Sequence, residues 1–241
     1  MNSERFDLAQ PFLMAVTIVR QHTIVLWWLV FVGLVNAATT LIDNTEFSTP
    51  LGILSFSLSL CSTPVIYGIY YELIEDIYSS ISKISRTYIL PYLWLLTRMY
   101  LPVIFLGWLP VILNPQSSGG GYFHIILISF SLLYLYVLPF FFFTGKQQGS
   151  IQLGILFLVR NISASTPLIF VVLLLETSLL LVQYNKAALL ARSTYLFTIL
   201  DFSSYLIASI IDFILFIVLI LILKNEFGKS SSNNLSGPRK H

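Results

Sequence analysis

The sequence predicts an all-α integral membrane protein, a polytopic bundle of six transmembrane helices with amphipathic helices along its cytoplasmic surface. Charged residues make up only 10% of the 241 residues, whereas soluble domains carry about 25%. Hydrophobic residues make up 56% of the chain and the mean hydropathy is +0.84. The apolar residues also gather in long runs, and one membrane-spanning helix needs a run of about 20.

Six runs are long enough to cross a bilayer: 23–42, 51–71, 91–113, 122–144, 164–183 and 197–223. The breaks between them carry turn residues, for example "NPQSSGGG" at 114–121 and "TGKQQGS" at 144–150. Helices are expected because unpaired backbone polar groups cannot face lipid. We therefore expect one transmembrane domain over residues 1–227.

Lysine and arginine predict the orientation, because cytoplasmic loops carry an excess of both. With the N-terminus inside, the external segments hold only Lys186 and Arg192. The internal segments hold ten: Arg5, Arg20, Lys83, Arg86, Lys146, Arg160, Lys224, Lys229, Arg239 and Lys240. This asymmetry predicts a multi-pass protein of the cytoplasmic membrane with both termini in the cytoplasm.

Short amphipathic stretches precede three of the spans on that side. Over 73–88, isoleucines recur at helical spacing, which is typical of a helix lying along the membrane surface: Ile74, Ile77, Ile81 and Ile84. We expect this helix to be a contact for a protein partner. Similar stripes precede the first span (Phe12, Val16 and Val19) and the fifth (Leu153, Leu156 and Phe157).

The tail from 228 to 241, "GKSSSNNLSGPRKH", is polar, basic and rich in small residues. Such a composition cannot bury enough apolar surface to fold. We expect a disordered cytoplasmic tail whose charges lie near anionic lipid.

Three charged residues lie within spans, namely Arg98, Glu176 and Asp212. Each costs about 2.5–3.5 kcal/mol at a helix centre on insertion scales. By helical rise, Glu176 and Asp212 lie about 18 Å and about 16 Å from the inner ends of their spans, and Arg98 reaches the same layer. We expect one intramembrane cluster. It is either a charge pair that locks three helices in register, which we favour, or a functional site, namely a proton or ion relay or a polar substrate site at mid-membrane.

The sixth span also carries a polar stripe on one face, at i, i+4, i+7, i+8 and i+11: Asp201, Tyr205, Ala208, Ser209 and Asp212. A polar stripe on a spanning helix faces protein or water and not lipid. Small residues line the second span at Gly52, Ser55, Ser59 and Ser62, a pattern that favours close helix packing.

Enzyme signatures are missing from the sequence. The histidines His22, His124 and His241 are scattered, and Cys61 is the only cysteine, so no metal set is predicted. Phosphate-binding, dinucleotide-binding and hydrolase motifs do not occur. No basic stripe suggests a nucleic acid. We expect no catalysis and no cofactor.

Two segments carry a resemblance to a known family. "TPVIYGIYYELIEDIYSSI" places a proline and a glycine in the second span before the amphipathic stretch, and "GSIQLGILFLVRNISASTPLIF" ends a helix in Arg-Asn before the fifth span. Together they resemble bacterial six-span proteins related to the membrane domain of glycerophosphodiester phosphodiesterases. The resemblance implies no catalysis, because the soluble phosphodiesterase domain is missing from this sequence.

The layout also resembles the permease subunits of six-span ABC exporters. Those proteins have an N-terminal interfacial helix, a coupling helix between spans two and three and short outer helices before span six, and 3–20, 73–88 and 185–196 take these places. The segment at 150–160 departs from that plan.

The function expected first is that of a non-enzymatic membrane-embedded partner or scaffold in a larger complex. Its partners would be the lipid bilayer and either another protein or a second copy of the chain. The alternative is a permease subunit of an ABC-type exporter that works with a separate ATPase through the isoleucine stripe. A third expectation is an ion-coupled carrier that uses Glu176 and Asp212.

Overall fold

The computed structural model of the chain describes residues 8–42, 45–113, 120–145, 149–185, 188–190 and 193–235. In this part of the chain the ordered elements are all helices, and the expected membrane helix bundle is confirmed. The helices are α1 (Ala9–Gln21), α2 (Thr23–Leu41), α3 (Thr45–Ile74), α4 (Ile81–Leu113), α5 (Gly120–Leu133), α6 (Val137–Thr144), α7 (Ser150–Arg160), α8 (Ile162–Tyr184) and α10 (Thr194–Leu235).

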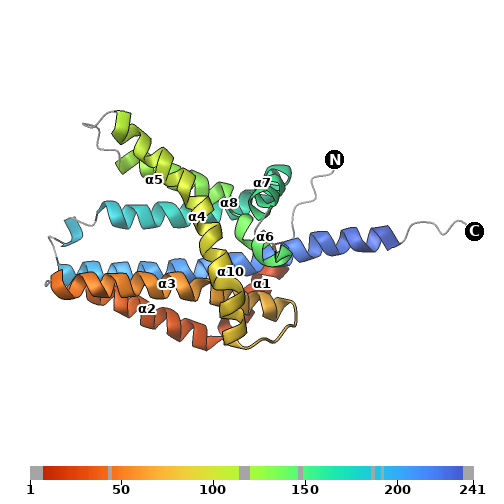
Figure 1. The fold of residues 1–241 in the computed structure, drawn as a ribbon, viewed down its shortest axis with the longest axis horizontal. Helices are drawn as coiled ribbons and strands as arrows, with labels where there is room; N and C mark the ends of the chain where they lie inside the picture. Colours follow the sequence, from red (N-terminus) through yellow and green to blue (C-terminus); the bar gives the residue numbers. More distant parts are fainter. Residues whose placement is uncertain are drawn as a thin grey trace, which may run out of the picture.

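Five helical segments are long and apolar enough to cross a membrane. The pair α1 and α2, bent by 74° at the break between them, makes a sixth candidate. In Figure 1, α3, α8 and α10 run along the long axis while α4 crosses them steeply. We call the end with α1, α6, α7 and the α3–α4 connection the near end. The opposite end, where α8 stops and α10 begins, is the far end.

The core lies at the near end, around the second half of α10. Phe213 and every residue from 215 to 223 are buried there, and α10 packs against α1, α2, α3 and α6. The short helix α6 contributes an aromatic run whose members Phe140, Phe141 and Phe142 are at most 3% exposed. Apolar side chains therefore fill the near half of the bundle.

One glycine sets the packing of α7 against this core. A Cβ on Gly154 would lie 2.7 Å from the backbone N and Cα of Val137, the first residue of α6. Only a residue without a side chain allows so close an approach. The hydroxyls of Tyr136 and Ser165 also share a hydrogen bond of 2.9 Å, which ties the start of α6 to α8.

The single amphipathic helix predicted over 73–88 is wrong. Asp76 adopts a left-handed conformation (φ 55°), and the Ile77 N–H donates to the carbonyl of Glu72 at 2.8 Å. This is the Schellman arrangement that ends a helix. A bend follows, in which the Ser79 N–H donates to the Glu72 carboxylate at 3.0 Å, and α4 starts at Ile81.

The break divides the isoleucine stripe. Ile74 and Ile84 are buried at 7% and 3% exposed, whereas Ile77 and Ile81 are 47% and 65% exposed. Lys224 of α10 holds the end of α3, since its Nζ donates to the Ile74 carbonyl at 2.8 Å and lies 3.3 Å from the Glu75 carboxylate.

Two other expected boundaries change. The fourth span is not one helix, because a turn at 134–136 separates α5 from α6. The tail expected to be disordered from 228 begins as helix, because α10 continues to Leu235. The helices expected before the first and fifth spans are present as α1 and α7. The remaining tail at 236–241 and the charges Lys146, Lys186 and Arg192 lie outside the described residues.

Candidate functional site: an acid-lined chamber between the helices

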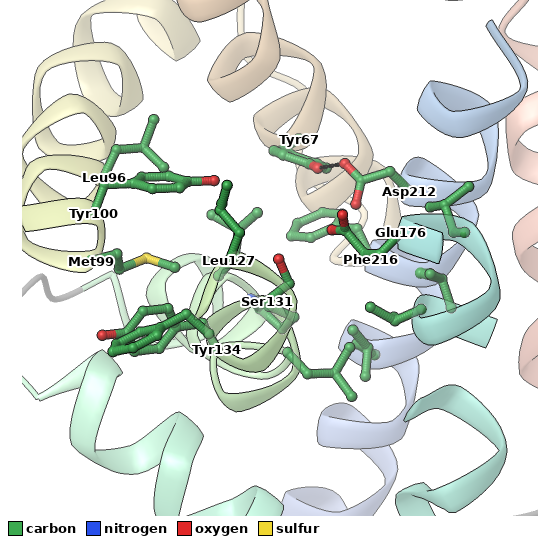
Figure 2. A pocket seen from close by; sticks show the side chains of 18 of the residues that line it. Tyr67, Leu96, Met99, Tyr100, Leu127, Ser131, Tyr134, Glu176, Asp212 and Phe216 are labelled. Carbon is green, nitrogen blue, oxygen red and sulfur yellow. Dashed lines mark hydrogen bonds between the residues drawn. The ribbon is translucent and has the colours of Figure 1, made fainter. Parts of the chain in front are cut away.

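A cavity of about 250 Å³ lies between α3, α4, α5, α6, α8 and α10, and we call it the chamber (Figure 2). Its wall is mostly apolar, with leucine, valine and phenylalanine side chains. Its side chains that carry oxygen are Tyr67, Tyr92, Tyr100, Ser131, Tyr134, Glu176 and Asp212. In Figure 2 the hydroxyls of Tyr100 and Ser131 point toward the interior, whereas that of Tyr134 points away.

Asp212 of α10 is hydrogen-bonded across the bundle. The Tyr67 hydroxyl on α3 donates to its Oδ2 atom. The Tyr67 ring is itself held between Phe213 and Phe216, with ring centroids 5.3 Å and 4.3 Å away. Asp212 is surrounded by protein atoms, yet by surface accessibility it is an exposed residue, because its carboxylate faces the chamber. A phenol satisfies one carboxylate oxygen but supplies no compensating charge.

Glu176 of α8 brings a second carboxylate to the same wall. Figure 2 shows its carboxylate beside that of Asp212. The two acids interact electrostatically with each other, and both interact with the hydroxyl of Tyr100 on α4. The structure thus brings the two acids that were placed at one depth by the sequence to the same chamber.

Arg98 does not join them, so the expected three-residue cluster is wrong in its cation. The chamber-facing residues of α4 include Leu96, Tyr100 and Val103, which share one side of the helix. Arg98 lies two residues from both Leu96 and Tyr100, and two residues turn a helix by about 200°. Its exposed side chain projects from the opposite face and makes no ion pair with an acid in the described part of the chain.

Sequence reasoning missed the tyrosines Tyr67, Tyr92 and Tyr100. Their spacing carried a weak signal, because Tyr92 and Tyr100 are eight residues apart and therefore share a helix face. A tyrosine in the middle of a span usually needs a partner for its hydroxyl. Only the fold reveals that Tyr67, on a different helix, is the partner of Asp212.

The chamber has the chemistry of a cation site. Two carboxylates side by side in a low-dielectric interior need a proton or a bound cation to neutralise them. No lysine or arginine lines the chamber among the residues the structure describes. Nor do His, Cys, Asp and Glu there gather in a group of three that could hold a metal ion. The polar groups that this wall offers to a ligand are thus the two carboxylates and the hydroxyls of its tyrosines and serine.

Comparison of the chain with protein-family models, curated proteins and solved structures finds no match.

Proposed function

We propose that this protein is a membrane carrier that binds a compact organic cation between Glu176 and Asp212. The observation that supports the proposal is the pair of carboxylates, set on two different helices and facing one chamber without a lysine or arginine in its described lining. In a membrane, acids that face a cavity in this way mark ion or substrate pathways more often than structural contacts.

Size and lining favour an organic cation over a bare proton. One water needs only about 10–15 Å³ of such space, so a chamber of about 250 Å³ has room for an ion of several heavy atoms. Tyr67, Tyr92 and Tyr100 line the chamber together with the two acids. A cation over an aromatic face gains about 0.5–2 kcal/mol, and the gain is larger away from water. A proton would use the acids but not the rings.

The near end is proposed to be the cytoplasmic side of the membrane. The lysines and arginines that the structure describes at this end include Arg20, Lys83, Arg86, Arg160 and Lys224. Their concentration agrees with the excess of basic residues on cytoplasmic surfaces. The far end would then open toward the outside of the cell.

The test is binding of choline to the purified protein in lipid nanodiscs, measured by calorimetry. The matched neutral probe is 3,3-dimethylbutan-1-ol, which has the shape of choline without its charge. We expect choline to bind and the alcohol to bind at least tenfold more weakly. Equal affinities would refute a cation site.

Variants locate the binding. Glu176→Gln and Asp212→Asn each remove one charge at nearly constant volume, and each should weaken choline binding about tenfold or more. Glu226→Gln is the matched control, because Glu226 lies on α10 outside the chamber lining. If all three variants bind choline like the unmodified protein, the site is not the chamber.

A second candidate function is that of a subunit that binds a protein partner, as the sequence led us to expect. The connection between α3 and α4 exposes Ile77 and Tyr78, at 47% and 83%, beside the exposed Ile81. This apolar segment at the near end suits a membrane-embedded scaffold or a permease subunit joined to an ATPase. Affinity purification in mild detergent tests it against the double variant Ile77→Ser/Tyr78→Ser. A stoichiometric ATPase lost in the variant would favour the permease, and a different partner lost in it would favour the scaffold.

A further inference from the structure

A second cavity, also of about 250 Å³, lies toward the far end of the bundle. Three helices line it: Asn36 of α2, Leu179 and Val182 of α8, and Asp201, Ser204, Tyr205, Ala208 and Ser209 of α10. These α10 residues include four of the five members of the polar stripe noted in the sequence. The stripe faces this cavity with its first four members and the chamber with the fifth, Asp212.

The partition between the two cavities is one helical turn thick. On α10 the far cavity ends at Ser209 and the chamber begins at Asp212. On α8 the lining of the far cavity ends at Leu179 and that of the chamber begins at Glu176. Three residues correspond to about 4.5 Å of helix rise. Both acids therefore lie about one helical turn from the far cavity, and Leu179 is the residue of its α8 wall that lies nearest to Glu176 in the sequence.

The walls of the far cavity differ in how firmly they are packed. A Cβ on Gly33 of α2 would lie 2.9 Å from the Phe202 ring and 3.1 Å from the Tyr205 ring, so α2 and α10 are in tight contact. By contrast, α8 is the least buried of the five long apolar segments. Elements with few buried contacts open at the lowest free energy. The α8 wall, with Leu179, is therefore less tightly packed against protein than the α2 wall.

Toward the near end the packing is tight. Beyond Asp212 in that direction, α10 is buried at Phe213 and from 215 to 223, and the aromatic run of α6 closes over it. The polar stripe thus leads from the acids toward the far end only.

We infer that the far cavity is the vestibule through which a cation travels between water at the far end and the chamber, with Leu179 as the gate. The identity of the cargo rests on the proposed function, whereas water access through the vestibule does not. This separation allows the two ideas to fail independently.

Substituted cysteines test the vestibule. Cys61 is the only native cysteine, so Cys61→Ala gives a background without thiols. A membrane-impermeant cationic methanethiosulfonate is applied from the far side of sealed vesicles with the protein in one orientation. It reacts with thiolates, which form in water and not in lipid. We expect Ser204→Cys and Ser209→Cys to react at least tenfold faster than Ile207→Cys.

Ile207 is the matched control because it lies on the same helix between the two serines, and its side chain, 58% exposed, is not among the residues lining the cavity. A Ser209→Cys variant that reacts no faster than Ile207→Cys would overturn the vestibule. Fast labelling without any choline supports it even where the choline calorimetry fails.

The gate is tested at Val172, an α8 residue that lines the chamber below Leu179. Val172→Cys should react slowly from the far side, and Leu179→Ala should accelerate that reaction about tenfold. An unchanged rate, in protein that still elutes as a single folded species, would mean that the chamber is not reached past Leu179.

Discussion

The two halves of α10 differ sharply although they belong to one continuous helix. From Phe213 to Leu223 the side chains are buried at no more than 8% exposed, apart from the half-buried Ile214. From Ile199 to Asp212 not one side chain is fully buried, and the polar stripe faces two cavities. Asp212 is the last residue of the loose half and the neighbour of the tight one.

This difference shows what stabilises each half. Lipid tails are as apolar as leucine, so helices in a membrane associate through close packing and hydrogen bonds and not through exclusion of water. The near half meets that need with interlocking apolar and aromatic side chains. The far half cannot pack in this way, because its polar side chains must avoid lipid and therefore line the two cavities. A cation bound at Asp212 would therefore lie at the boundary between the tightly packed near half and the less tightly packed far half.

The largest expected effect is on the free energy of unfolding, and it is tested by truncating one isoleucine to alanine in each half of α10. Ile220 is fully buried and Ile207 is 58% exposed. Ile220→Ala should lower the free energy of unfolding by about 2–5 kcal/mol, because it leaves a cavity in packed surroundings. Ile207→Ala should cost much less, since lipid fills the space. Thermal unfolding in detergent, followed by intrinsic fluorescence, measures both variants.

Equal losses at the two positions would mean that the halves are equally well packed. In that case the cavities beside the polar stripe would not make the far half of α10 less stable than the near half. The substitution is the same at both sites and both lie in one helix, so differences in helix propensity do not enter the comparison.

The hydrophobic pattern predicted most of the fold. Long apolar runs determine where helices cross, and these runs correspond to α2, α3, α4, α8 and α10. The pattern could not predict the break after Ile74, because it depends on the left-handed conformation of Asp76, a residue type with no strong preference for it, and on the Glu72–Ser79 contact. The apolar run from 122 to 144 likewise gave no sign of the turn at 134–136.

The site was predictable only in part, for a geometric reason. Depth along a span follows from residue number, so Glu176 and Asp212 could be placed in one layer. Rotation about the helix axis relative to neighbouring helices depends on tertiary packing, so Arg98 was assigned to the cluster although it faces away. The contact between Tyr67 and Asp212, 145 residues apart, follows from the same packing.

A smaller effect should follow from Tyr67→Phe. The change removes the hydroxyl that donates to Asp212 but keeps the ring packed between Phe213 and Phe216. A hydrogen bond to a charged group contributes about 1.5–3 kcal/mol, and this one helps to stabilise the carboxylate that a cation would bind. We expect choline affinity, measured by calorimetry, to fall about tenfold.

Tyr136→Phe is the control for this prediction. Its hydroxyl is also buried and hydrogen-bonded, to Ser165 at 2.9 Å, but it does not line the chamber. It should leave choline affinity unchanged. A Tyr67→Phe variant that binds choline like the Tyr136→Phe variant would show that the phenol of Tyr67 positions the helices and not the acid.

The smallest expected effect lies at the ion pair of the near end. Lys224 and Glu75 are 3.3 Å apart, with side chains 45% and 26% exposed. Partly exposed pairs contribute about 0.2–1 kcal/mol and weaken with salt. A double-mutant cycle with Lys224→Met and Glu75→Gln should give a coupling free energy of about 0.5 kcal/mol that falls as salt is raised.

Lys224→Met alone should lower the free energy of unfolding more than Glu75→Gln does, because only the lysine also donates to the Ile74 carbonyl. Equal single costs would mean that the end of α3 does not need this cap, and that apolar packing alone holds the near half together.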